Sequence, residues 1–204
     1  MALGNLTKLA LRLGDIAAAN GYADQCLALE RAAGNTRGIL LGLECLGQIR
    51  LAEGDVPGAR AALEESLGLS RTLGDAFGEA MALHQLGLAA ELDGDRRTAL
   101  RLLVTALRGR YEVGDREDLA VSLDRVAALA AGTEPALAVR FLAAAEELRE
   151  RHRLQAPPDT ETRRAQTLAA TREALDAPAF GAAWTGGRDA PLELIVDQVT
   201  ELAD

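Results

Sequence analysis

The chain has 204 residues, of which 49% are hydrophobic and 26% charged, and this composition predicts a folded protein with an apolar core. Its 31 acidic and 22 basic residues give a formal net charge of −9, which disfavours direct contact with nucleic acid. Lys8 is the only lysine, so the chain lacks the lysine of a phosphate-binding G-x-x-x-x-G-K-[ST] loop. Schiff-base chemistry is disfavoured for the same reason.

Targeting and metal-binding signals are also missing from the sequence. It contains no apolar run of about 18 residues and no signal-peptide pattern, so we expect a cytoplasmic protein with no membrane contact. Cys26 and Cys45 are expected to be reduced thiols. Because His84 and His152 are the only histidines and no Cys-x-x-Cys pair occurs, we expect no metal and no cofactor.

A glycine followed by aspartate or asparagine recurs every 20 residues along the first half of the chain. Glycine readily takes the left-handed conformation that ends a helix, and Asp or Asn caps the next helix by accepting hydrogen bonds from its first amides. Each pair therefore predicts the end of one helix and the start of another, which makes a series of helical hairpins. The pairs begin at Gly14, Gly34, Gly54, Gly74, Gly94 and Gly114.

The 20-residue segments alternate between two kinds, so the true period is 40 residues. Residues 40–51 match residues 80–91 and 120–131, and residues 19–27 match residues 59–67 and 99–107. Their apolar residues recur at spacings of three and four, which predicts one apolar face per helix. A glycine inside a helix costs about 0.5–1 kcal/mol relative to alanine. Its recurrence at Gly47 and Gly87 therefore predicts close contact between the helices of each hairpin.

The pattern of Leu86-Gly87 in one helix and Ala99 and Ala106 in the next resembles the tetratricopeptide repeat. This resemblance implies an all-α fold, a right-handed superhelical solenoid of helical hairpins. The sequence departs from the usual pattern in its period, which is 40 rather than about 34 residues. It also has Gly-Asp where that repeat ends in proline. HEAT-like repeats, which share the longer period, are a minor alternative.

We divide the chain into four repeats, over about residues 1–34, 35–74, 75–114 and 115–153, followed by a C-terminal helical cap over residues 154–204. The N-terminus falls within a repeat, so its apolar edge is expected to be covered by residues outside this chain. Pro157 and Pro158 predict a non-helical link. Cap helices are expected over about residues 160–176, from about 178 to Gly186-Gly187, and over 191–202, with Phe180 and Trp184 packing over the last repeat.

A second resemblance involves the C-terminal third of the chain. Three segments carry it: Phe141-Leu142-x-Ala144-Ala145-Glu146, Pro157-Pro158 and Phe180-x-x-x-Trp184. Together they resemble the end of large actinobacterial LuxR-type transcriptional regulators, in which a DNA-binding domain and a STAND-type ATPase precede a tetratricopeptide region. The resemblance implies a non-catalytic sensing or protein-interaction arm. Neither an ATPase motif nor a DNA-reading element occurs here, and a free-standing adaptor protein is the alternative.

In tetratricopeptide superhelices the concave groove is lined by the first helix of each repeat. The 40-residue register then predicts a binding strip in which His84 lies between carboxylates of the neighbouring repeats. We expect it to bind a protein or peptide partner, or a small-molecule effector, by hydrogen bonding. A solvated groove without a ligand is the alternative, and self-association is left open. The strip comprises Glu44, Cys45, Gln48, His84, Gln85, Leu88, Asp124 and Arg125, with Leu41 and Met81 nearby.

Three other interpretations of these residues are disfavoured. A metal held by Glu44, His84 and Asp124 would have a single histidine, which is a poor ligand set for a transition metal. A Cys45–His84 nucleophile would lack a third orienting residue. The arginines of residues 149–153 and 163–164 form either a phosphate or acidic-partner site or, as we favour, a solvated charged face.

Overall fold

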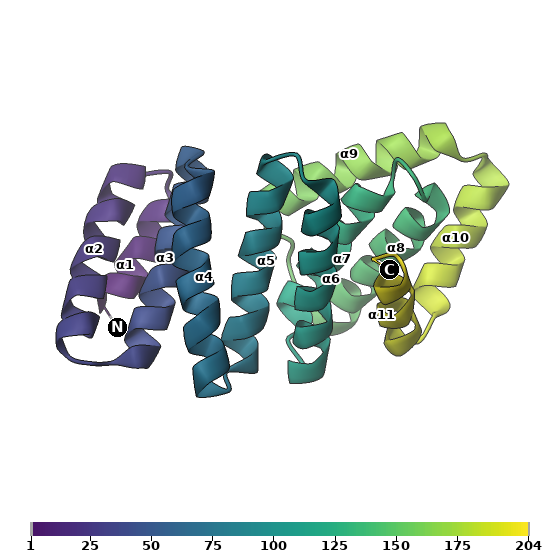
Figure 1. The fold of residues 1–204 in the computed structure, drawn as a ribbon. Helices are drawn as coiled ribbons and strands as arrows, with labels where there is room; N and C mark the ends of the chain where they lie inside the picture. Colours follow the sequence, from purple (N-terminus) through teal and green to yellow (C-terminus); the bar gives the residue numbers. More distant parts are fainter. Residues whose placement is uncertain (1, 204) are drawn as a thin grey trace. The chain divides into compact units, whose positions relative to one another are not determined.

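The computed structural model describes residues 2–203, which form eleven α-helices and no strand (Figure 1). The predicted all-α class is therefore confirmed. Neighbouring helices pack against one another within two compact units, residues 1–102 and 103–204, and the division falls inside α6. The helices are α1 (Ala2–Arg12), α2 (Ile16–Ala32), α3 (Thr36–Glu53), α4 (Val56–Leu73), α5 (Ala76–Leu92), α6 (Arg96–Val113), α7 (Arg116–Ala130), α8 (Pro135–His152), α9 (Pro158–Ala174), α10 (Ala177–Asp189) and α11 (Leu192–Glu201).

The helix ends follow the 20-residue Gly-Asp/Asn pattern. All six glycines of the pattern have positive φ, between 64° and 77°, which is the left-handed region that glycine adopts without a steric penalty. The acidic or amide side chain that follows each glycine accepts a hydrogen bond from the backbone amide three residues later. The predicted end of one helix and start of the next are confirmed at each of these positions.

In the first unit, α1 to α5 pack through small residues and leucines. Ile49 of α3 is fully buried against Ala10 of α1 and against Ala19 and Ala23 of α2. The predicted close contact at Gly47 is confirmed, because a Cβ added there would lie 2.5 Å from Cδ2 of Leu63 on α4. Glycine at this position thus allows the two helices of the hairpin to approach.

The second unit is built around α8, against which α7, α9, α10 and α11 all pack. Phe141 and Leu142 of α8 are fully buried. Ile195 and Val199 of α11 are buried as well, so the apolar face of the last helix lies in the core of this unit. Residues 158–201 therefore cover α7 and α8, as a terminal cap does.

The cap differs from the prediction in one detail. The pair Gly186-Gly187 does not end a helix, because α10 continues to Asp189. A Cβ at Gly187 would lie 2.3 Å from the backbone oxygen of Arg140, so this glycine allows α10 to pack on the α8 backbone. Phe180 and Trp184 are half-buried and stack on each other with ring centroids 6.1 Å apart, and the guanidinium of Arg172 on α9 lies 5.2 Å from the Phe180 ring.

Of the helices in residues 2–203, none has the length and apolarity needed to cross a lipid bilayer.

Candidate functional site

The eight residues of the predicted strip lie on three helices in two units. Glu44, Cys45 and Gln48 are on α3, His84, Gln85 and Leu88 are on α5, and Asp124 and Arg125 are on α7 of the second unit. Four of them are buried rather than solvated, with exposed fractions of 3% for Glu44, 4% for Cys45, 6% for His84 and 1% for Asp124. The other four are half-buried. The strip is therefore less open to solvent than its polar composition indicates.

Asp124 is engaged in ion pairs inside the second unit. Its carboxylate accepts a hydrogen bond from Arg149 of α8, and Nε of Arg164 on α9 lies 3.7 Å from the other carboxylate oxygen. Burial raises the pKa of Asp124 even though Arg149 and Arg164 both act to lower it. The carboxylate therefore joins α7, α8 and α9, and a ligand would have to break these pairs to reach it.

Arg164, near the proline link, and Arg188 of α10 are also paired with acids. Arg164 contacts Glu146 as well as Asp124. Arg188 of α10 donates to Glu150 on α8 and, over 2.7 Å, to Glu147. Because these guanidinium groups face carboxylates of their own unit, the observed contacts favour a structural charged cluster over a phosphate site.

Glu44 is the most unusual ionisable group of the first unit. Its side chain is almost fully buried on α3, and Oε1 has no hydrogen-bond partner in the described part of the chain. Burial raises its pKa from 4.5 to about 7, and the repulsion of Asp75 adds to this shift while the attraction of Lys8 opposes it. Near neutral pH this carboxyl group is therefore partly protonated and can act as a hydrogen-bond donor.

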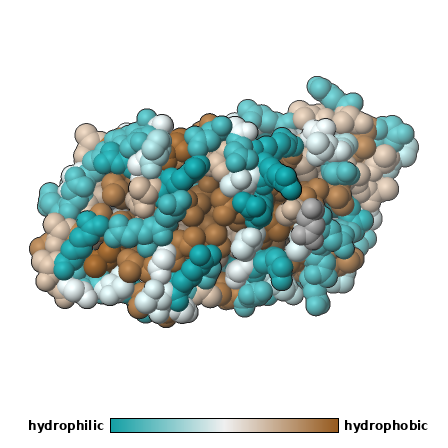
Figure 2. All heavy atoms as spheres, in the orientation of Figure 1, coloured by the Kyte–Doolittle hydropathy of each residue, from teal (hydrophilic) through white to brown (hydrophobic). Residues whose placement is uncertain are grey.

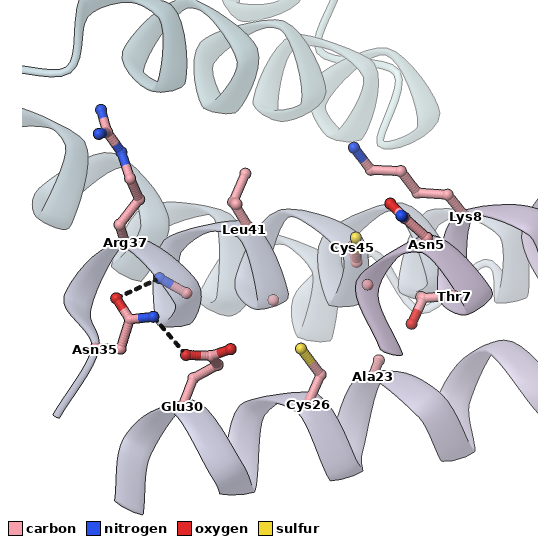
Figure 3. Close-up of a pocket in the computed structure, with 13 residues that line it drawn as sticks. Asn5, Thr7, Lys8, Ala23, Cys26, Glu30, Asn35, Arg37, Leu41 and Cys45 are labelled. Carbon is pink, nitrogen blue, oxygen red and sulfur yellow. Dashed lines mark hydrogen bonds between the residues drawn. The ribbon is translucent and has the colours of Figure 1, made fainter. Parts of the chain in front are cut away.

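A partly open cavity of about 390 Å³ is lined mainly by residues of α1, α2 and α3 (Figure 3). Of the predicted binding strip and its two named neighbours, Cys45 and Leu41 line it. The same register extended back by 40 residues would have added two more, because Asn5 corresponds to Cys45 and Lys8 to Gln48. The lining residues are Gly4, Asn5, Thr7, Lys8, Ala23, Cys26, Glu30, Asn35, Arg37, Gly38, Leu41, Gly42 and Cys45.

The inner wall of this cavity is apolar, and its buried thiol, that of Cys45, is not activated. Cys26 of α2 and Cys45 of α3 are both free thiols and line the same space (Figure 3). Burial raises the pKa of Cys45, so its thiol is neutral at physiological pH and a weak nucleophile. Leu41 and Ala23 supply hydrocarbon surface to the same walls. These walls suit an apolar group better than a covalent reaction.

The charges around the cavity are unevenly distributed. Lys8 and Arg37 contribute two cations; Figure 3 shows Lys8 extending across the opening from α1 and Arg37 standing at its other end. Arg37 is 75% exposed and only 3.4 Å from Asp75, a weak surface pair. The one acidic lining residue, Glu30, already accepts a hydrogen bond of 2.6 Å from the Asn35 amide (Figure 3). The rim therefore favours an anionic group.

The described residues contain no group of three or more His, Cys, Asp and Glu side chains arranged to hold a metal ion. No protein-family model and no curated protein matches the chain.

Proposed function

We propose that this chain is a non-catalytic binding module and that its ligand site is the cavity lined mainly by α1, α2 and α3. The observation that carries the proposal is the cavity itself, whose volume of about 390 Å³ falls in the range of about 300–1,000 Å³ typical of small-molecule sites. Its walls are apolar, and Lys8 and Arg37 stand at the rim. The site therefore suits a ligand with an apolar body and an anionic end, such as a short carboxylate.

The proposal includes the arrangement of the repeats. We propose that residues 1–153 form a right-handed tetratricopeptide-like solenoid of four hairpins. The 40-residue register, the six glycine helix ends and the close approach at Gly47 support it. Two free thiols are typical of a reducing compartment, and we accordingly place the protein in the cytoplasm.

The biological role that fits best is the C-terminal arm of a LuxR-type regulator with a STAND ATPase. In that role a bound ligand stabilises one arrangement of the arm and shifts the population of active states of the attached domains. The resemblance of residues 136–202 to such arms supports it. A free-standing adaptor is the second candidate, favoured by the exposed Leu6 and Leu9 on α1. The reading frame upstream of Met1 separates the two roles, because a nucleotide-binding domain in the same frame is expected for the regulator only.

The ligand site can be tested by thermal shift of the full chain with a panel of short aliphatic and aryl carboxylates and their matched alcohols. A Cβ at Gly4 would meet no atom within 4 Å, so Gly4→Phe is expected to fill the cavity without disturbing the fold. Gly21→Phe on α2 is the matched control, because Gly21 is equally open but does not line the cavity.

We expect carboxylates to raise the melting temperature more than the alcohols do. Gly4→Phe should abolish this effect, Lys8→Gln should weaken it, and Gly21→Phe should leave it intact. If no carboxylate stabilises the chain, or if Gly4→Phe responds as the parent does, the proposed ligand site is wrong.

A further inference from the structure

The end of the first unit formed by α1 and α2 exposes three leucines outside the cavity. Leu6 and Leu9 of α1 have exposed fractions of 40% and 51%, and Leu29 of α2 has 62%. In the view of Figure 2, apolar patches lie among hydrophilic side chains where α2 runs, at the left. Single exposed leucines are common on protein surfaces. These three are distinguished by their positions in the repeat.

The corresponding residues one repeat later form an interface between hairpins. Forty residues on, Leu6, Leu9 and Leu29 correspond to Leu46, Ile49 and Leu69. Ile49 is fully buried against Ala19 and Ala23 of α2, and Leu46 and Leu69 pack around a cluster that contains Leu27 of the same helix. In the hairpin α3–α4, Ile49 thus covers α2, and the other two positions complete the apolar cluster that contains Leu27.

The next hairpin uses the first two positions in the same way. Leu86 and Ala89 of α5 are the counterparts of Leu6 and Leu9, and both are buried. Leu86 packs against Ala59 and Leu63 of α4. The register also holds at the start of α1, since residues 1–3 and 81–83 are both Met-Ala-Leu. The exposed α1–α2 face therefore continues an interface that occurs twice within this unit.

The helices that fill this interface share one pattern. On α2 the contacting residues are Ala19, Ala23 and Leu27, and on α4 the equivalents are Ala59, Leu63 and Leu67, which are likewise four residues apart. We propose that the α1–α2 face docks a helical hairpin of this same repeat, whose second helix carries alanine, alanine or leucine, and leucine at four-residue spacing.

A second copy of the chain fits this face less well. In the first unit the two helices with the required pattern, α2 and α4, are already covered by Ile49 and Leu86. If two copies packed through their α1 helices, leucines would face leucines, and the interface would lack the small residues that occur in the interfaces within the unit.

The test extends the full chain by a copy of residues 35–80 placed directly before Met1. Met1 then occupies the position of Met81, so the added hairpin meets α1 in the 40-residue register. We expect one cooperative unfolding transition, a melting temperature higher by at least about 5 °C, and amide hydrogen exchange in α1 slowed at least about tenfold. An added hairpin that stays unprotected, or α1 exchange that stays unchanged, would overturn the proposal.

Substitutions in and next to α1 test whether an increase in the melting temperature of the extended chain comes from contacts at the proposed face. The double substitution Leu6→Lys, Leu9→Lys should change the melting temperature of the present chain little, because both side chains are exposed there. In the extended chain it should remove the expected increase in melting temperature. Leu13→Lys, one residue beyond the end of α1, is the matched control, because Leu13 is 75% exposed and its counterpart Glu53 is exposed as well. If the extended chain keeps its higher melting temperature in the Leu6→Lys, Leu9→Lys variant, the proposal is wrong. A dimer of the present chain that Leu9→Lys dissociates would assign the face to a second copy and would overturn it too.

Discussion

Replacing Glu44 by glutamine is expected to stabilise the first unit at neutral and alkaline pH. The carboxyl group is 3% exposed, its Oε1 has no hydrogen-bond partner in the described part of the chain, and its pKa is raised from 4.5 to about 7. An acid whose pKa is raised by folding binds its proton more tightly in the folded state. The contribution of Glu44 to the free energy of unfolding is therefore highest below pH 4.5 and falls as the pH rises to about 7.

The size of this effect follows from the two pKa values. At about 1.4 kcal/mol for each factor of ten in proton affinity, the charged carboxylate costs the folded state about 3 kcal/mol above pH 7. Linkage places about 2 kcal/mol of that loss between about pH 5.5 and 8. In this window Asp95 and Glu150, whose pKa values are lowered, stay charged and contribute no slope. The glutamine variant should lack the part of the decrease in the free energy of unfolding that Glu44 causes, because its amide does not titrate.

The assay is urea unfolding of the full chain followed by circular dichroism at several pH values, with hydrogen exchange of the α3 amides reporting on the first unit. Glu64→Gln on α4 is the matched control, because it removes one charge from an exposed side chain. We expect the free energy of unfolding of Glu44→Gln to exceed that of the parent by about 2 kcal/mol more at pH 8 than at pH 5.5. A parent whose pH profile matches that of Glu44→Gln would refute the reasoning, since Glu44 would then be charged without cost.

Three further substitutions test the packing. Gly47→Ala should destabilise the chain by about 1–3 kcal/mol through overpacking, whereas Gly68→Ala on the open side of α4 should be neutral or stabilising by up to about 1 kcal/mol; equal unfolding midpoints would argue against the close approach. Gly187→Ala should loosen the packing of α10 on α8 and so speed amide hydrogen exchange in α10, whereas Gly181→Ala in the same helix should not. Similar exchange rates in the two variants would show that α10 does not depend on the close contact at Gly187. Asp124→Ala should lower the free energy of unfolding by about 3–5 kcal/mol, because it leaves the buried Arg149 without its carboxylate partner, and a loss below about 1 kcal/mol would mean that this ion pair contributes little.

The helix ends were determined by the sequence alone because their causes are local. A glycine at positive φ and a capping side chain three residues from an amide act within one turn of chain, so the six Gly-Asp/Asn pairs are sufficient to locate them. The close contact at Gly47 was also predictable, because a repeated helical glycine has a propensity cost that packing must offset. Residues 186–187 show where this local reasoning fails, since glycine there serves packing instead of a helix end.

The tertiary structure alone decided how the polar residues are used. The register places Glu44 and Asp124 at equivalent positions of their helices. Among the described residues, however, Oε1 of the buried Glu44 has no hydrogen-bond partner, whereas the buried Asp124 forms ion pairs with Arg149 and Arg164. Which of these occurs depends on the side chains of helices far along the chain, which a periodic pattern does not specify. The cavity has the same origin: its walls come from α1, α2 and α3, and its volume is set by how closely these helices approach.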